Sequence, residues 1–371
     1  MKIGFEAKRA FQNFTGLGNY ARFVIKTLSD HQPQNKYFLY APKAANNLRT
    51  SVLFGLKNVR IRTAPISFLR SYWRSKGVVK DLIKDKIELY HGLSHELPKG
   101  LKQANIKSVV TIHDLIFLRF PHYFKYLDRK IYGLKFRSAC KNADKIIAIS
   151  EQTKRDIIHF FGTDEQKIKV IYQGCDPAFY EPISAEAKKT ITVKYNLPTD
   201  FLLCVGTLEE RKNQLLILKS LKQLPKSFQL VLIGKKTGYF TTINNFIEKN
   251  QLQNRVKILC DVPFNDLPSI YQLAKIFIYT SRFEGFGIPI LEALNCGIPV
   301  IASTGSCLEE AGGNHSIYVS PDNETELAKA ILKVWNDEIL QEKMILEGKE
   351  YALNFREEKI AEDLMRLYKN I

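Results

Sequence analysis

Short apolar segments alternate with helical segments along almost the whole chain, and this alternation restricts the possible folds more than any other feature. β-branched and aromatic residues dominate the short segments, which predicts buried strands. Because helical segments separate successive strands, we expect parallel sheets covered by helices, an α/β architecture. The expected strands are residues 2–7, 37–40, 59–63, 88–91, 108–113, 145–150, 168–172, 201–205, 229–233, 256–260, 276–280, 299–302 and 317–319.

The alternation is interrupted over residues 173–200. This stretch holds three prolines and no strong hydrophobic period, as a boundary between domains does. A chain of 371 residues has the length of about two domains. We therefore expect one domain over residues 1–175 and a second over residues 176–355, followed by an amphipathic helix over residues 356–371.

With 45% hydrophobic and 25% charged residues, the composition is that of a globular protein. The N-terminal residues lack the apolar core of a signal peptide, and no apolar run has the length of a membrane span. The six cysteines are scattered without a C-x-x-C pair, which suits thiols in a reducing compartment. We therefore expect a cytoplasmic protein.

The net charge of +17 is distributed unevenly along the chain. Residues 1–175 carry 32 Lys and Arg against 13 Asp and Glu, whereas residues 176–371 carry 23 against 25. Such an asymmetry indicates that the N-terminal half meets an anionic partner. Nucleic acid, an anionic membrane surface and an acidic substrate are the candidates.

The most informative motif lies at residues 275–303, where a strand, a glycine-bearing loop, a helix and a second strand are expected in succession. Pro289 stands at the start of that helix and Gly297 just after its end, the positions that these residues favour. The amino end of a helix attracts anions, because backbone N–H groups and the helix dipole point toward it. Glu284 in the loop and Glu292 in the helix add carboxylates that can accept hydrogen bonds from sugar hydroxyls.

A second motif, GTLEERKN, follows the strand expected at residues 201–205. Arg211 and Lys212 lie there, near the carboxyl end of a strand, where open α/β domains bind their ligands. Either cation is a suitable partner for phosphate groups. A solvated loop is the alternative interpretation.

A third motif, TGLGNYA at residues 15–21, contains the pattern G-x-G-x-x-A, with Gly16 and Gly18 as its glycines. In a dinucleotide-binding fold this pattern follows the first strand directly. Here about eight residues intervene after Ala7, and the next strand ends without an acidic residue for a ribose. We therefore reject a dehydrogenase and interpret Gly16 as part of a loop that faces phosphates or substrate.

His113 ends the strand expected at residues 108–113, a position that faces ligands in α/β domains. It is a candidate catalytic residue, and a structural histidine is the alternative. The chain has no D-x-D sequence and no His or Cys spacing typical of a metal site. We therefore predict that no metal is bound.

These motifs together resemble glycosyltransferase family 4, a large family of retaining enzymes with the GT-B fold. FEGFGIPILEALNCGIPVIAS carries the most specific likeness, and TGLGNYAR, TIHDLIFLRFP, AISEQTKRDI, VIYQGCDPAF and VGTLEERKN occur in the family's order. The likeness covers nearly the whole chain. It implies two Rossmann-like domains with parallel sheets facing a central cleft, and a last helix that crosses back to the N-terminal domain.

The resemblance also implies a role for each candidate residue. The C-terminal domain would bind a nucleotide sugar, and the N-terminal domain would bind the acceptor. Lys212 would hold the diphosphate, Glu292 the ribose hydroxyls and Glu284 the donor sugar. His113 would lie near the transferred sugar and form the catalytic set with Glu284 and Lys212. The remaining donor-binding residues would be Gly16, Arg211, Phe286, Gly287, Ile288 and Leu291.

One position departs from the family pattern. Thr207 stands where many members carry an arginine, and Arg211 is the candidate for the second positive charge. Positive charge is needed because cleavage of a sugar–phosphate bond builds negative charge on the leaving diphosphate. No nucleophile is evident, so the family analogy implies retention by a front-face route, without a metal or another cofactor.

The implied function is transfer of a hexose from a nucleoside diphosphate sugar to a glycan or lipid-linked saccharide, in the synthesis of a cell-surface polysaccharide. TGLGNY, HDLIFLRFP and GTLEERKN resemble the mannosyltransferase-like branch, which favours mannose from GDP-mannose. A UDP-sugar donor of glucose, galactose or an N-acetylhexosamine is the alternative within the class. A nucleic-acid-binding protein is disfavoured, because no recognition module is evident. A sugar-nucleotide binder without activity is the remaining alternative.

The sequence of the N-terminal half also predicts peripheral docking at the inner face of an anionic membrane. Aromatic and basic residues are interleaved in residues 68–74 and 123–137. A helix over the second segment would have cations mostly off its apolar side, the pattern of an interfacial helix. The alternative is a helix whose apolar face packs on its own sheet. The expected apolar side comprises Tyr123, Leu127, Ile131, Leu134 and Phe136.

Overall fold

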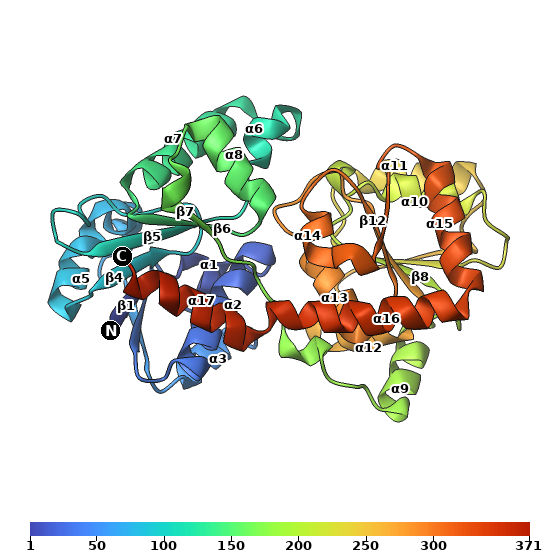
Figure 1. The fold of residues 1–371 in the computed structure, drawn as a ribbon, viewed down its shortest axis with the longest axis horizontal. Helices are drawn as coiled ribbons and strands as arrows, with labels where there is room; N and C mark the ends of the chain where they lie inside the picture. Colours follow the sequence, from blue (N-terminus) through green and yellow to red (C-terminus); the bar gives the residue numbers. More distant parts are fainter. The chain divides into compact units, whose positions relative to one another are not determined.

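The computed structural model describes residues 1–371 and divides into two compact units (Figure 1). Unit 1 comprises Met1–Gly174 and Phe355–Ile371, and unit 2 comprises Cys175–Asn354. Each unit has its own parallel sheet and its own helices. The expectation of two Rossmann-like α/β domains is therefore confirmed.

Seven strands form the sheet of unit 1, in the order β3-β2-β1-β4-β5-β6-β7, and every neighbouring pair is parallel. The order reverses between β1 and β4, which pair directly. Helices cover both faces of such a sheet, so its central strands appear as continuous apolar runs in the sequence. The strands are β1 (Lys2–Glu6), β2 (Lys36–Ala41), β3 (Val59–Thr63), β4 (Leu89–Gly92), β5 (Lys107–Ile112), β6 (Lys145–Ala148) and β7 (Ile168–Val170).

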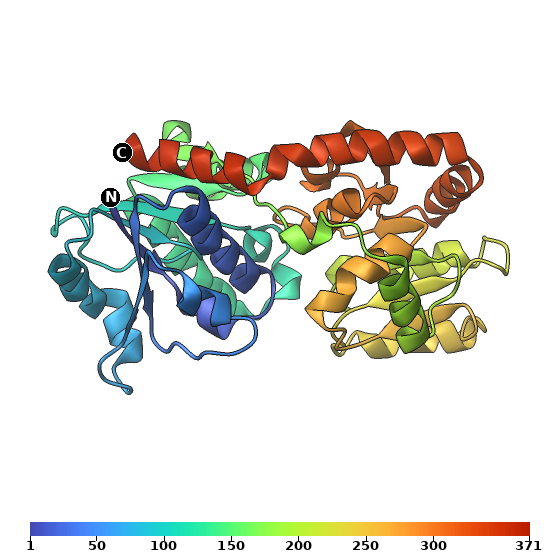
Figure 2. The same ribbon diagram turned by 90° about the horizontal axis from the view of Figure 1, so that it is seen from below.

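The C-terminal helix belongs to unit 1, as predicted. It packs beside the second helix of the chain, and Figures 1 and 2 show the red C-terminal helix along the blue one. The helices of unit 1 are α1 (Lys8–Gln12), α2 (Gly16–His31), α3 (Ser51–Gly55), α4 (Arg70–Tyr72), α5 (Val78–Asp85), α6 (Ile116–Arg119), α7 (Tyr126–Asn142), α8 (Glu151–Phe161) and α17 (Glu357–Lys369).

Six strands form the sheet of unit 2, in the order β10-β9-β8-β11-β12-β13, again with parallel neighbours only. The order reverses between β8 and β11. The carboxyl ends of the strands beside such a reversal are where α/β domains bind ligands. The strands are β8 (Leu202–Val205), β9 (Leu230–Ile233), β10 (Val256–Leu259), β11 (Ile276–Tyr279), β12 (Val300–Ser303) and β13 (Ile317–Val319).

The helices of unit 2 include two that the sequence pattern did not predict, α9 and the short α14. Helix α9 lies within the proline-bearing stretch, and Ile191 is its only buried residue, too little to produce an apolar stripe. The helices are α9 (Ala185–Tyr195), α10 (Gln214–Leu221), α11 (Phe240–Lys249), α12 (Leu267–Leu273), α13 (Ile288–Cys296), α14 (Leu308–Gly312), α15 (Glu324–Asn336) and α16 (Glu338–Ala352).

Two further features concern the whole chain. All six cysteines are free thiols, and five of them are buried. None of the helices combines the length and the apolar character that crossing a membrane requires.

Candidate active site

The predicted donor-binding residues of unit 2 gather at its switch point. Arg211 and Lys212 lie in the loop after β8, within a 3₁₀ turn over residues 210–212. Glu284 lies in the loop after β11, the strand that pairs with β8 across the reversal. Residues about seventy positions apart in the sequence thus meet at one edge of the sheet.

An ion-pair cluster is formed by these three side chains. Lys212 Nζ donates to Glu284 Oε1 over 2.6 Å, and Arg211 Nη1 lies 2.8 Å from Glu284 Oε2. Arg211 Nη2 also donates to Glu209 Oε1 over 2.6 Å. Tyr279 is the last residue of β11, and its hydroxyl accepts from Lys212 Nζ over 2.7 Å. The side chains of the central three residues are largely buried, between 12% and 18% exposed.

The cluster fixes the charge of its members. Burial alone would raise the pKa of Glu284, but Lys212 and Arg211 outweigh burial and hold this pKa at about 2. Burial would likewise lower the pKa of Lys212, yet Glu284 holds it above its ordinary value. The two cations and the carboxylate therefore stay charged at neutral pH. Two carboxylates, Glu284 and Glu209, face the two cations, so the cluster carries no excess charge without a ligand.

Backbone contacts hold the two loops against each other. The N–H of Arg282 donates to the Arg211 carbonyl over 2.9 Å, and the Thr280 hydroxyl donates to the Asn213 carbonyl over 3.0 Å. The close approach of β8 and β9 behind them needs glycine, because a Cβ on Gly234 would lie 1.9 Å from the Gly206 carbonyl oxygen. The positions of Arg211 and Lys212 are therefore set by the fold rather than by loop flexibility.

The amino end of α13 lies directly after the Glu284 loop. Gly287 precedes the helix with a φ of 139°, a conformation that glycine adopts without strain, and no side chain caps the helix. The Cys307 thiol donates to the carbonyl oxygens of Phe286 and Glu284, over 2.9 and 3.1 Å, and so fixes the loop from behind. The amino end of a helix without a side-chain cap favours an anion, because its backbone N–H groups and its dipole point toward it.

Glu292 lies further along α13. The Tyr271 hydroxyl of α12 donates to Glu292 Oε2 over 2.7 Å. Burial raises the pKa of Glu292 to about 7, although the Tyr271 hydrogen bond opposes that rise. Unlike Glu284, this carboxyl has no cation as its partner among its recorded contacts and changes charge near neutral pH.

Two of the predicted donor contacts are restricted by burial. As whole residues, Phe286 and Leu291 are 2% and 0% exposed, so Leu291 offers a ligand no accessible atom and Phe286 very few. Leu291 packs in the core, and its carbonyl accepts from Asn295 Nδ2 over 2.8 Å. Ile288, the first residue of α13, is partly exposed and remains available through its side chain.

Gly16 lies in unit 1, where it is the first residue of α2 rather than part of a loop. A Cβ on Gly16 would meet no atom within 4 Å, whereas one on Gly18 would lie 1.8 Å from the Asn13 carbonyl oxygen. Gly18 is therefore the glycine that packing requires. At Gly16, by contrast, the space beside the start of α2 is open.

His113 follows β5 and is buried in unit 1. Its Nε2 donates to the Leu93 carbonyl over 2.9 Å, which leaves Nδ1 as an acceptor. Burial lowers its pKa to about 4, so the ring is neutral at pH 7. The Tyr20 ring stands edge-on against it, with centroids 4.5 Å apart.

A buried polar chain supports Tyr20, and sequence reasoning missed it. The Tyr20 hydroxyl lies 3.0 Å from Thr111 Oγ1, which is 2.8 Å from His91 Nε2. His91 Nδ1 lies 2.7 Å from the hydroxyl of Tyr368 on α17. His91 on β4 was a visible signal, but the other members of the chain come from three separate segments, α2, β5 and α17.

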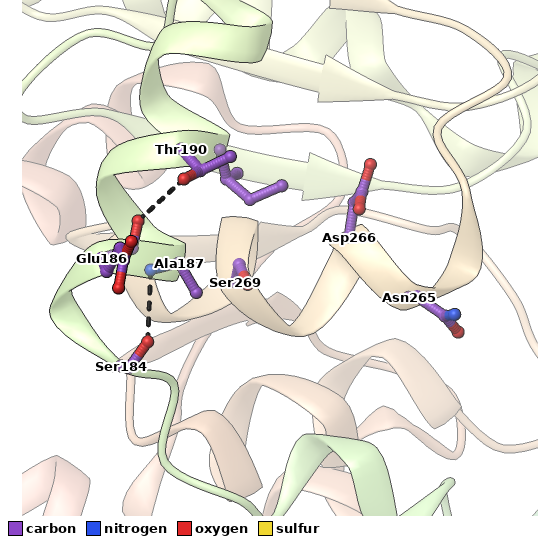
Figure 3. A pocket seen from close by; sticks show the side chains of 8 residues that line it. Ser184, Glu186, Ala187, Thr190, Asn265, Asp266 and Ser269 are labelled. Carbon is purple, nitrogen blue, oxygen red and sulfur yellow. Dashed lines mark hydrogen bonds between the residues drawn. The ribbon is translucent and has the colours of Figure 1, made fainter.

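A hollow of about 440 Å³ lies elsewhere in unit 2, between α9 and the segment that leads into α12 (Figure 3). Ser184 and Thr190 in its wall bond to the backbone of α9, as Figure 3 shows. Asp266 is held by Lys194 over 2.7 Å. No member of the ion-pair cluster lines this hollow, so it is not part of the candidate site.

Two family models match the chain. The model described as "Glycosyltransferase Family 4" matches residues 15–179, and the one described as "Glycosyl transferases group 1" matches residues 188–351. The chain is a family 4 glycosyltransferase. The family predicted from the motifs is thereby confirmed.

Relatives and solved structures agree with this assignment. The glycosyltransferase is 26% identical to O-antigen chain mannosyltransferase B of Escherichia coli, over 100% of both chains. It is 26% identical to O-antigen chain mannosyltransferase RfbU of Salmonella typhimurium, over 75% of this chain and 72% of that one. The fold matches that of HepE of Anabaena, crystallised with UDP, with a TM-score of 0.78 at 20% identity over 100% of both chains. The GT-B fold is confirmed.

Proposed function

We propose that this glycosyltransferase moves a hexose, with mannose from GDP-mannose as the leading donor, to a glycan or lipid-linked saccharide in the synthesis of a cell-surface polysaccharide. The names of two relatives support the choice of mannose, since both proteins are described as O-antigen chain mannosyltransferases. A UDP-sugar is the second candidate donor, favoured by the UDP in the HepE crystal.

The ion-pair cluster of unit 2 carries the proposal. Without a ligand, Glu284 is the partner of both Lys212 and Arg211. An incoming diphosphate competes for the two cations and frees oxygens of Glu284 to accept hydrogen bonds from sugar hydroxyls. The same three residues thus bind both ends of the sugar–phosphate bond.

The rest of unit 2 completes the donor site. The uncapped start of α13, with the backbone N–H groups of Phe286, Gly287 and Ile288, contacts the phosphates and the sugar. Glu292 accepts from the ribose hydroxyls in its ionised form. Leu291 packs beneath this site and is not proposed to contact the donor, because the whole residue is buried.

Unit 1 is proposed to bind the acceptor. His113 accepts a hydrogen bond from a hydroxyl of the transferred sugar through Nδ1, since Nε2 is occupied by the Leu93 carbonyl. The open helix start at Gly16 borders the phosphates and the acceptor. Both assignments follow from the family motifs and are compatible with the local geometry.

The proposed chemistry is a front-face substitution. The bond between the anomeric carbon and the diphosphate oxygen breaks, and the acceptor oxygen bonds to that carbon from the same face. The acceptor proton passes to the departing phosphate oxygen, so no protein nucleophile takes part. Lys212, Arg211 and the α13 start stabilise the negative charge that develops on the diphosphate. Because these groups supply the positive charge, we propose that the reaction needs no metal.

The proposal is tested by identifying which nucleotide sugar the protein binds and whether it transfers that sugar. Thermal unfolding is measured with GDP-mannose, GDP, UDP-glucose, UDP-N-acetylglucosamine and UDP, because a ligand in excess raises the melting temperature. Transfer of radiolabelled sugar from the stabilising donor to a saccharide acceptor then tests activity. Stabilisation by UDP compounds alone would replace mannose with the second candidate. Stabilisation without transfer to any acceptor would indicate a sugar-nucleotide binder without activity.

A further inference from the structure

Helix α7 carries apolar side chains on two opposite faces. Phe136, Ala139 and Cys140 point inward and are buried in a core that includes Phe117. Leu127 and Leu134 point outward, and these two residues are 72% and 73% exposed. The expectation that Phe136 shares a side with Leu127 is therefore wrong, because nine residues correspond to about two and a half helical turns.

Cations border the outward leucines. Lys130, Lys135 and Lys141 are exposed, and Asp128 is the single acidic residue of the helix. The exposed ring of Tyr126 lies 5.5 Å from the cationic groups of both Arg129 and Lys130. The prediction that the cations lie away from the apolar side also needs correction, since they flank it. Apolar side chains among cations and an aromatic ring are typical of a helix at a lipid interface.

A second exposed apolar group precedes α5. Phe68 is 83% and Tyr72 is 58% exposed. Trp73, which the sequence grouped with them, is instead buried, and its indole N–H donates to Asp81 over 2.6 Å. The outward group of this segment therefore consists of Phe68, Tyr72 and the exposed Arg70.

Glu96 connects the two segments. Its Oε2 lies 3.0 Å from Nη2 of Arg74, which is two residues after the Phe68–Tyr72 segment. Its Oε1 lies 2.9 Å from Lys135 Nζ on α7. The two exposed groups thus belong to one region of unit 1, and Figure 1 shows α7 on the outside of the sheet.

We infer that the outward face of α7 and the Phe68–Tyr72 segment form one docking surface for an anionic lipid bilayer. In this arrangement Leu127, Leu134 and Phe68 enter the boundary between head groups and acyl chains, and the lysines contact lipid phosphates. This assigns the membrane contact predicted from the sequence to specific side chains. Its use in bringing the enzyme to a lipid-linked acceptor rests on the proposed function.

Charge favours a bilayer over a second copy of the chain. Unit 1 carries 36 Lys and Arg against 17 Asp and Glu, a net charge of +19, whereas unit 2 carries −2. A symmetric dimer through this surface would place the same cations opposite each other. An anionic leaflet attracts every one of them.

Vesicle co-sedimentation of the full chain tests this inference. The protein is expected to pellet with phosphatidylcholine vesicles that contain phosphatidylglycerol, to stay in solution with phosphatidylcholine alone, and to be released by salt. Leu127→Ser with Leu134→Ser, and separately Lys130→Glu with Lys141→Glu, should each lower the vesicle partition coefficient by about tenfold or more. These side chains point outward, so the melting temperature should stay unchanged.

Matched controls come from unit 2. Ile339 and Leu346 on α16 are 81% and 71% exposed, so Ile339→Ser with Leu346→Ser removes similar apolar surface and should leave binding intact. Lys329→Glu with Lys333→Glu on α15 gives the same charge change as the lysine pair.

Three outcomes would overturn the inference: no binding to anionic vesicles at low salt, equal loss in controls and α7 variants, or self-association that the α7 variants abolish. Vesicle binding needs no nucleotide sugar, so it succeeds or fails independently of donor binding. Loss of transfer to a lipid-linked acceptor, with transfer to a water-soluble analogue kept, would connect the surface to the proposed function.

Discussion

Units 1 and 2 share a strand order around their switch points but differ in the chemistry placed there. In unit 2 the strands β8 and β11 lead into a buried cluster of permanent charges, Arg211, Lys212 and Glu284. In unit 1 the switch point lies between β1 and β4. His91 lies on β4 and His113 follows the next strand, β5, and burial lowers the pKa values of these two histidines to about 3 and about 4. Unit 1 instead carries its cations on the surface. The same frame thus fixes where a site lies, while the side chains decide what it binds.

Removal of Lys212 should have the largest effect. Lys212→Ala should reduce transfer by at least ~10²-fold, because it deletes a cation that stabilises the leaving diphosphate. Arg211→Ala should cost less, since Glu209 already shares its charge. Initial rates with the preferred donor measure both. A larger loss for Arg211 than for Lys212 would show that the two cations have been assigned to each other's roles.

Glu292→Gln should come next. The amide keeps the size of the side chain but removes the charge that ribose hydroxyls favour, so we expect a loss of ~1–3 kcal/mol in donor binding. Titration calorimetry with the nucleotide sugar measures this loss. Full donor affinity in the folded variant would remove Glu292 from the site.

Donor affinity should depend on pH through Glu292. Because its pKa is raised to about 7, the carboxyl is mostly protonated at pH 6 and ionised at pH 8. Binding to the ionised form should therefore strengthen by up to about tenfold over this range. Stability without ligand should change in the opposite direction, falling as the pH rises from 4.5 toward 7, because the folded state holds the extra proton there.

Glu292→Gln provides the control for that pH dependence, and both trends should disappear in it. His113 should contribute nothing in this range, since its pKa of about 4 keeps it neutral. If donor affinity in the variant still depended on pH, a group other than Glu292 would be titrating. The contrast between a titrating donor site in unit 2 and neutral histidines in unit 1 would then be wrong.

Tyr368→Phe should affect unit 1 alone. It leaves Nδ1 of the buried His91 without its partner, which should cost ~1–3 kcal/mol of stability. Chemical denaturation measures this cost, and donor affinity in unit 2 should stay at the level of the unsubstituted protein. A parallel loss of donor affinity would show that the polar chain of unit 1 influences the donor site.

The smallest effect is expected from chelation. Excess EDTA should leave the transfer rate unchanged, since Lys212, Arg211 and the start of α13 are proposed to replace a metal. A loss of activity that Mg²⁺ or Mn²⁺ restores would contradict the metal-free route.

Much of the fold could be predicted from the sequence because its signals are local. Most strands appeared as short apolar runs, and Pro289 with Gly297 marked both ends of α13. Helix α9 was missed because one buried residue leaves no periodic pattern. Candidate residues were found because they follow strands directly, where a loop reaches the ligand-binding edge of the sheet.

The sequence by itself determined the family, the parallel architecture and the identity of the charged residues, since motif order and hydrophobic period are properties of neighbouring positions. Only the tertiary structure decided how those residues combine. The fold brought Lys212 to Glu284, 72 positions away, and left Glu292 without a cation among its recorded contacts, so two similar carboxylic acids acquired opposite pKa shifts. It also decided which apolar face of α7 is buried, because both faces are apolar and only packing against the sheet distinguishes them.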